Sequence, residues 1–133
     1  MTKILLDTNF CMIPFQFKVD IFTEIKRIVD GNYVVCVLDK TIDELNELVK
    51  IGKGKNKINA KLALQLLNKK KVKIIKTKSE KYVDDLIVDL VGDDWIVCTQ
   101  DIGLRKRLKI KNNKEKKNVK IIIMRQKKYL IIV

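Results

Sequence analysis

Continuous apolar runs alternate along this 133-residue chain with segments in which apolar residues recur every three or four positions. An unbroken run of aliphatic and β-branched residues predicts a strand buried on both faces of a sheet, and the second pattern predicts an amphipathic helix. The predicted strands are residues 4–6, 33–38, 72–75, 95–99, 119–124 and 129–133. Their alternation with helices predicts an α/β fold with three layers, α/β/α, and a mainly parallel central sheet. The length is that of a single domain, residues 1–133.

The predicted helices lie between these runs. Asp20 is a candidate N-cap for a helix that ends at Gly31. Further helices are predicted after Asp39, at residues 58–70, from Ser79 to residue 91, and at residues 104–109. A short helical turn and loop are predicted at residues 10–17, loops at residues 51–57 and 111–118, and a turn at residues 126–128 that makes the last strand an antiparallel edge. The glycines and lysines of residues 51–57 lack the complete phosphate-binding pattern and follow a helix, so we interpret them as a linker.

The cysteines carry no metal-binding or disulfide pattern. Cys11, Cys36 and Cys98 are widely spaced and lie within apolar runs, which is typical of buried thiols and favours a reducing, cytoplasmic setting. No apolar run approaches the roughly 18 residues of a membrane span. The first residues lead directly into a strand, which leaves no room for a signal peptide.

Charge is segregated along the chain, whose net charge is +13. Residues 50–81 and 102–133 each carry 12 Lys or Arg and one acid, whereas residues 82–101 carry six acids and no base. Such segregation is typical of a polyanion-binding surface around an acidic pocket, although each lysine-rich segment alone is equally a solvated surface. The candidate phosphate contacts are Lys53, Lys55, Arg105, Lys106 and Arg107. Aromatic residues are only 6% of the chain, which argues against a stacking platform for bases.

Four acids are expected at one edge of the sheet. Asp7 and Asp101 follow buried strands, and Glu44 and Asp85 lie early in predicted helices. Strand ends and helix starts on one side of a parallel sheet converge. Clustered carboxylates raise one another's pKa unless a cation neutralises them, and all-oxygen ligands select Mg²⁺ or Mn²⁺ over Zn²⁺. With a phosphodiester substrate, such ions activate water and stabilise the leaving oxygen.

Each acid also has a purely structural interpretation. Asp7 can cap the following turn, and Asp101 can cap the following helix. Thr41 and Glu44 have the spacing of a capping box. Asp85 can be a surface acid, as can its neighbour Asp84. These alternatives stay open at this point.

The motifs resemble those of the PIN-domain nucleases in order and approximate spacing. They are Leu6-Asp7-Thr8-Asn9, Asp43-Glu44-Leu45, Val83-Asp84-Asp85-Leu86-Ile87 and Val97-Cys98-Thr99-Gln100-Asp101. The chain is particularly similar to the archaeal PIN proteins related to those of small-subunit ribosomal RNA processing, through residues 7–10 with 14–17, and Arg125-Gln126 with Tyr129. It is more distantly similar to VapC-type toxins.

The resemblance implies a PIN-like fold and a metal-dependent endoribonuclease that acts on single-stranded or locally unpaired RNA. It implies that the carboxylates around Mg²⁺ or Mn²⁺ are Asp7, Glu44, Asp85 and Asp101, with supporting hydrogen bonds from Asn9 and Thr99. Asp84 is an alternative to Asp85, because the neighbouring acids leave the register open. The chain departs from many relatives at Gly103, where they carry a further acid.

A competing hypothesis is a catalytically weak RNA-binding or ribosome-assembly module with the same fold and basic surface. A phosphate-sensing receiver domain would need a pair of acids directly after its first strand, which residues 5–8 lack. The sequence leaves the choice between a toxin and a ribosomal RNA processing factor open. The expected partners are RNA, together with an antitoxin or a pre-ribosomal particle, and the apolar helices and residues 129–133 favour a homodimer.

Overall fold

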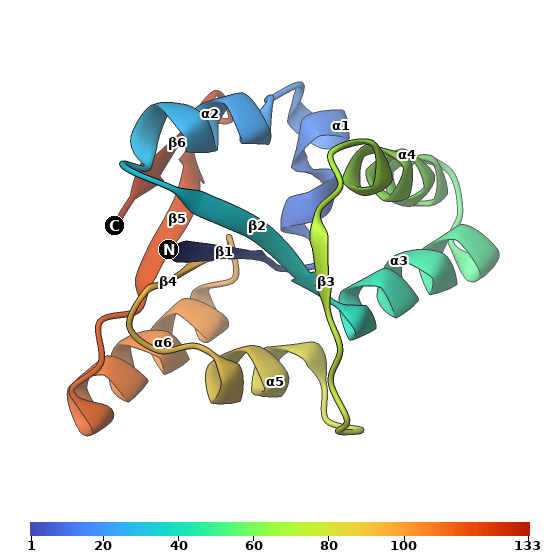
Figure 1. Cartoon of the computed structure of the whole chain (residues 1–133). Coiled ribbons are helices and arrows are strands. Elements are labelled where there is room, and N and C mark those ends of the chain that lie inside the picture. The colour runs from blue at the N-terminus through green and yellow to red at the C-terminus, as the bar shows by residue number, and fades with distance from the viewer.

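Six strands form one sheet, in the order β3-β2-β1-β4-β5-β6, in this computed structural model, which describes residues 1–133 (Figure 1). The strands are β1 (Thr2–Leu6), β2 (Tyr33–Leu38), β3 (Lys73–Ile75), β4 (Trp95–Cys98), β5 (Lys120–Arg125) and β6 (Tyr129–Ile132). The central strand β1 runs parallel to both β2 and β4, and β6 pairs antiparallel with β5. The mainly parallel sheet and its antiparallel edge, both predicted from the sequence, are confirmed.

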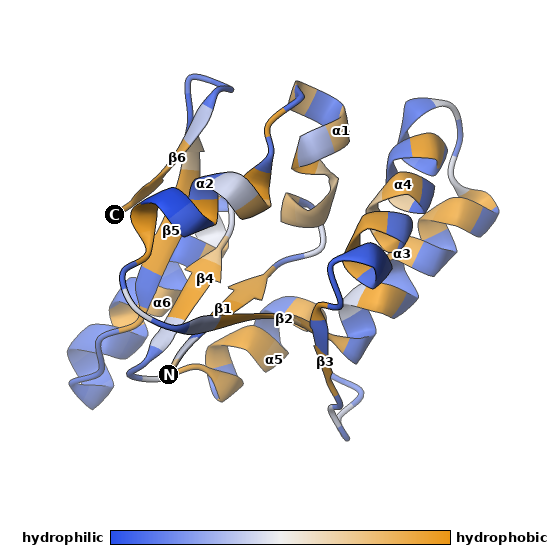
Figure 2. Cartoon of the chain, turned by 45° about the horizontal axis from the view of Figure 1, so that its top comes forward, coloured by the Kyte–Doolittle hydropathy of each residue, from blue (hydrophilic) through white to orange (hydrophobic).

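Helices cover both faces of this sheet (Figure 1). They are α1 (Ile13–Phe17), α2 (Ile21–Ile28), α3 (Asp39–Ile51), α4 (Lys55–Lys69), α5 (Val83–Leu90) and α6 (Ile102–Glu115), with a 3₁₀ turn, η1 (Phe10–Met12), before α1. Successive residues of a strand point to opposite faces, so Ile4 and Leu6 pack with α1, α2 and α4, while Leu5 packs with α5 and α6. Figure 2 shows apolar strands between helices that each carry an apolar and a polar side. The three-layer α/β/α class is thus confirmed.

Two helices near the site begin at other residues than the sequence predicts. The helix α3 begins at Asp39, directly after β2, so Thr41 is a buried residue inside the helix and not a cap. The capping box is therefore wrong. The helix α5 begins at Val83 instead of Ser79, and the Ser79 hydroxyl accepts a hydrogen bond of 3.2 Å from the backbone N–H of Lys81. Before this turn, the Asp39 carboxylate accepts hydrogen bonds from the backbone N–H (3.0 Å) and the hydroxyl (2.7 Å) of Thr77, which tie the segment to the start of α3.

Two predicted loops are largely helical. The linker at residues 51–57 shortens to residues 52–54, because α4 begins at Lys55. The helix α6 continues to Glu115, through most of the lysine-rich segment. The Asn112 side chain holds the end of α6 to the start of β5 by exchanging two hydrogen bonds, of 3.0 and 2.9 Å, with the backbone of Val119. All three cysteines are buried free thiols, as predicted. None of the helices is both long and apolar enough to cross a membrane.

Candidate active site at the carboxyl edge of the sheet

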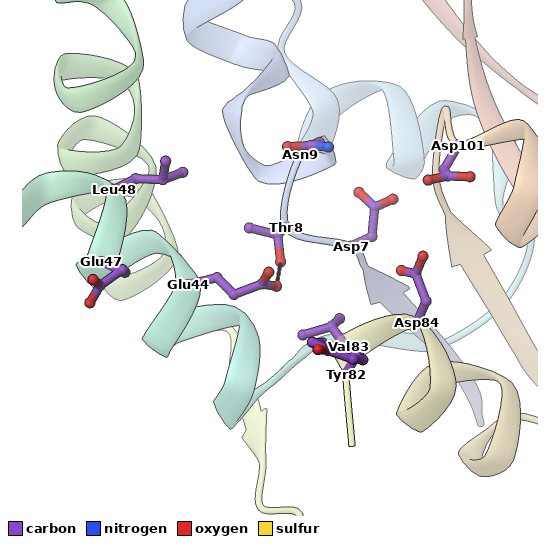
Figure 3. A pocket seen from close by; sticks show the side chains of 10 residues that line it. All are labelled: Asp7, Thr8, Asn9, Glu44, Glu47, Leu48, Tyr82, Val83, Asp84 and Asp101. Carbon is purple, nitrogen blue, oxygen red and sulfur yellow. Dashed lines mark hydrogen bonds between the residues drawn. The ribbon is translucent and has the colours of Figure 1, made fainter. Parts of the chain in front are cut away.

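One pocket opens where β1 and β4 end (Figure 3). The two strands are paired so that Leu6 lies beside Cys98, and the residues that follow them therefore emerge at the same edge. The helices α3 and α5 contribute the remaining walls. The lining residues are Asp7, Thr8, Asn9, Glu44, Glu47, Leu48, Tyr82, Val83, Asp84 and Asp101. Six oxygen-bearing side chains of the sequence motifs thus meet in one place.

Asp7 is buried at the centre of this pocket, with 6% of its surface exposed. One carboxylate oxygen accepts a hydrogen bond of 2.7 Å from the backbone N–H of Phe10, and the other accepts from the Thr99 hydroxyl. Burial raises the pKa of Asp7 to about 6, although the two hydrogen bonds act to lower it. The nearby negative charges of Asp84 and Asp101 add to the increase. A buried carboxylate with such a pKa is readily stabilised by a cation. Asp7 does form the predicted turn cap, and it faces the pocket as well.

Thr99 connects the two strand-end acids. Its fully buried hydroxyl donates to Asp7 and accepts a hydrogen bond of 3.0 Å from the backbone N–H of Asp101. This pair of bonds fixes the orientation of the Asp7 carboxylate relative to the first turn of α6. A supporting role for Thr99 is consistent with this position.

Asp101 is both a cap and a pocket residue. Its Oδ1 accepts a hydrogen bond of 2.9 Å from the backbone N–H of Leu104, which makes it the N-cap of α6. Its carboxylate is nevertheless exposed and lines the pocket. Gly103 leaves the space beside this carboxylate open, since a Cβ there would lie 3.1 Å from Asp101 Oδ1.

Asp84, and not Asp85, lines the pocket. The Asp84 carboxyl is partly buried; burial and the charge of Asp101 raise its pKa, while Arg107 opposes the increase. The carboxylate of Asp85 instead lies 2.8 Å from the Nη2 atom of Arg107 in an ion pair. Adjacent residues on a helix point about 100° apart, so only one of the two can face the pocket. We therefore replace Asp85 by Asp84 in the candidate site.

Glu44 enters the pocket from the second turn of α3. The Thr8 hydroxyl donates a hydrogen bond of 2.6 Å to its Oε1 atom (Figure 3). Asn9 lines the pocket as an exposed residue, with its amide free of hydrogen bonds to the protein. Sequence reasoning missed Thr8, Glu47 and Tyr82. Glu47 could have been predicted from its spacing of one helical turn from Glu44, and Thr8 from its place in the first motif.

The donor set suits a hard divalent cation. The charged groups that line the pocket are all carboxylates, the chain has no histidine, and its thiols are buried in the core. As the side chains stand, no three acids or thiols are grouped closely enough to hold a metal ion. Mg²⁺, however, keeps several waters and commonly binds through one or two carboxylates. The residues therefore fit Mg²⁺ or Mn²⁺ and do not form a closed structural cage.

The predicted phosphate contacts lie outside this pocket. Lys53 and Lys55 are exposed at the turn between α3 and α4, and Lys106 is exposed on α6. Arg107 pairs with Asp85, and Arg105 is half-buried with its Nε atom unpaired. Ion pairs with carboxylates involve only three of the 29 basic residues, namely Arg27, Lys81 and Arg107. Most of the positive charge is thus free to meet a polyanion.

Comparison with known proteins identifies the family of this chain. Residues 4–127 match the family described as PIN like domain. The chain is 31% identical over 136 residues to Ribonuclease VapC4 of Methanocaldococcus jannaschii, covering 99% of this chain and 97% of that relative. Its fold is similar to that of the PIN domain endonuclease Utp24, with a TM-score of 0.77 and 22% identity over 98% of this chain and 90% of the other. The family inferred from the sequence motifs is confirmed, and the chain belongs to the PIN-like domain family.

Proposed function

We propose that this protein is an endoribonuclease that depends on Mg²⁺ or Mn²⁺ and hydrolyses phosphodiester bonds of RNA in the pocket at the carboxyl edge of the sheet. The observation that carries the proposal is the buried Asp7, whose pKa is raised to about 6 while Asp84 and Asp101 line the same pocket. The 31% identity to a ribonuclease over nearly the whole chain supports the reaction class.

The buried and the exposed residues of the pocket would have different roles. Asp7 would hold the metal ion in the buried part, with its orientation set by Thr99 and Phe10. Asp84, Asp101 and Glu44 would complete the site from the exposed side. The bound ion would activate water and stabilise the leaving oxygen. The free Asn9 amide is placed to donate a hydrogen bond to the substrate phosphate.

The substrate backbone would be held by the unpaired cations outside the pocket. Lys53, Lys55, Lys106 and Arg105 carry no carboxylate partner. Contacts of this kind bind phosphates without reading sequence, so RNA affinity should fall steeply with salt. Arg107 can contribute only if it leaves Asp85.

Substitution of Asp7 tests the reaction directly. We expect Asp7→Asn to abolish cleavage of end-labelled single-stranded RNA in Mn²⁺ while RNA binding remains. Asp43→Asn is the matched control, because Asp43 is an exposed acid of α3 outside the pocket. Chelation by EDTA should stop the wild-type reaction. Absence of cleavage by the wild type in both Mg²⁺ and Mn²⁺ would overturn the proposal.

A catalytically weak RNA-binding or ribosome-assembly module is the second candidate. It is favoured by one observation, namely that no three acids are grouped as ready-made metal ligands. This function would leave RNA binding intact with no cleavage by the wild type. Binding and cleavage measured on one sample therefore separate the two candidates.

We further propose a toxin role, with an antitoxin as partner, ahead of ribosomal RNA processing in a pre-ribosomal particle. The identity to Ribonuclease VapC4 is 31%, whereas the likeness to Utp24 at 22% identity concerns the fold alone. Induced expression should then arrest growth, and Asp7→Asn should relieve the arrest. Accumulation of unprocessed small-subunit RNA after loss of the protein would instead support the processing role.

A further inference from the structure

Tyr82 is the most exposed of the large apolar and aromatic side chains, with 86% of its surface accessible. It precedes α5 directly and lines the active-site pocket. Most other aromatic side chains, including Phe10 and Trp95, pack in or against the two cores. Phe17 and Tyr129 also lie outside the two cores, but Tyr82 is the one aromatic residue that lines the active-site pocket.

The ring stands on the side of the pocket where apolar and acidic groups mix. Leu48 and Val83 supply the apolar surface of this side, and Glu44 and Glu47 supply carboxylates. In Figure 3, Tyr82 and Val83 lie between Glu44 and Asp84. The acids of the proposed reaction are thus immediate neighbours of an accessible aromatic ring.

The charges around Tyr82 determine which chemical groups of an RNA can lie against its ring. No Lys or Arg lines the pocket, so a phosphate placed against Glu47, which is not one of the proposed metal ligands, would meet negative charge without compensation. A flat neutral group meets no such repulsion. An accessible aromatic ring binds nucleobases through their faces, whatever the base, because every base has a π-face.

We propose that Tyr82 is a base-binding residue whose ring stacks on one unpaired base of the RNA beside the cleaved phosphodiester. The inference rests on the proposed ribonuclease function and gives a physical reason for a preference for single strands, because a base must leave its own helix to stack on protein. The low aromatic content still excludes an extended platform, and the structure assigns a single stacking position.

The test measures binding separately from cleavage. Each variant is made in the Asp7→Asn background, and its affinity for a labelled eight-nucleotide single-stranded RNA is measured by fluorescence anisotropy. Tyr82→Ala should weaken binding about fivefold to 100-fold, and Tyr82→Phe should bind as before, because stacking needs the ring and not the hydroxyl. Ile110→Ala, at a 55% exposed apolar residue of α6 outside the pocket, is the matched control and should have no effect.

Abasic substitution at each position of the RNA locates the stacked base. At one position, removal of the base should weaken binding by the parent protein and cancel the difference between Tyr82 and the alanine variant. Equal affinity of Tyr82→Ala and the parent for the intact RNA overturns the inference, as does a loss that persists at every abasic position.

The cleavage assay on the wild type keeps the two proposals apart. If the wild type cleaves RNA but Tyr82→Ala does not change RNA affinity, base stacking is rejected and the ribonuclease proposal stands. Base-dependent binding without cleavage supports the stacking position and rejects the enzyme. Duplex RNA of the same sequence should show no Tyr82 effect, and an equal effect on duplex would also overturn the inference.

Discussion

The pocket has two halves that are built differently. The strand half consists of Asp7 and Thr99, which are buried and fixed by hydrogen bonds at the ends of adjacent parallel strands. The helix half consists of Glu44 on α3 and Asp84 on α5. These two side chains are more exposed and have fewer hydrogen-bond partners. The difference indicates one preorganised carboxylate and several adjustable ones. A metal ion would bind first to the fixed group and draw the others in.

The largest expected difference is between two adjacent acids of α5, namely Asp84 of the helix half and Asp85 outside the pocket. Asp84→Asn should lower the rate of RNA cleavage by about 100-fold or more, because a charge facing the reaction is lost. Asp85→Asn should change it by less than about threefold, since Asp85 pairs with Arg107 on the exposed surface. Steady-state cleavage assays on both variants measure this. The reverse order of effects would show that α5 presents its other acid to the substrate.

The next prediction concerns the free energy of unfolding in the strand half. The pKa of Asp7 is about 6 in the folded protein and 3.8 in its ordinary state, so the folded protein binds the proton more tightly. The contribution of Asp7 to the stability of the metal-free protein should therefore be most favourable below the lower pKa and fall as pH rises through the window between the two pKa values. The shift corresponds to about 3 kcal/mol.

Asp7→Asn should remove this pH dependence. In EDTA, urea unfolding should find the variant more stable than the wild type by up to about 3 kcal/mol above the folded-state pKa, and equally stable well below pH 3.8. Saturating Mn²⁺ should stabilise the wild type only. Parallel pH profiles for the two proteins would contradict the burial of an ionised Asp7.

Thr99 tests how much the preorganisation of the strand half contributes. Thr99→Val keeps the shape of the side chain and removes the hydroxyl that donates to Asp7, so Mn²⁺ affinity should fall about tenfold to 100-fold. Thr99→Ser should restore most of it. Isothermal titration with Mn²⁺ gives the affinities. An effect on cleavage with unchanged metal affinity would place Thr99 in substrate binding instead.

The smallest effect is expected from Thr8, which follows β1 and donates a hydrogen bond to Glu44 of the helix half. Thr8→Val removes the hydrogen bond to Glu44 but leaves an adjustable carboxylate on α3, so cleavage should fall less than about tenfold. Thr8→Ser should behave as the wild type. A loss as large as that of Asp84→Asn would mean that Glu44 is as strictly fixed as Asp7, and the contrast between the halves would disappear.

The same contrast explains how far the sequence predicts this molecule. Continuous apolar runs identify strands, and parallel strands bring their ends together, so the positions of Asp7, Thr99 and Asp101 follow from local pattern alone. The three-layer fold follows from the same runs. Residues at strand ends are predictable because the sheet leaves them a single edge to occupy.

Residues on helices depend on contacts between distant parts of the chain. The sequence predicts a helix from Ser79, but α5 begins at Val83, and the segment before it is tied to the distant Asp39 through Thr77. The choice between Asp84 and Asp85 depends on Arg107, which lies on another helix. No local pattern contains these contacts. The exposure of Tyr82 could not be predicted from the sequence for the same reason, because it depends on where α5 begins.

The central claim is that the acids at the carboxyl edge hold a divalent metal ion around Asp7. A crystal grown with millimolar Mn²⁺ and measured for anomalous scattering tests it most directly. The account predicts a manganese peak at about 2.0–2.3 Å from a carboxylate oxygen of Asp7, with Asp84 or Asp101 as a further ligand or held through water. A pocket without manganese, or a peak at Asp85 with none at Asp7, would contradict it.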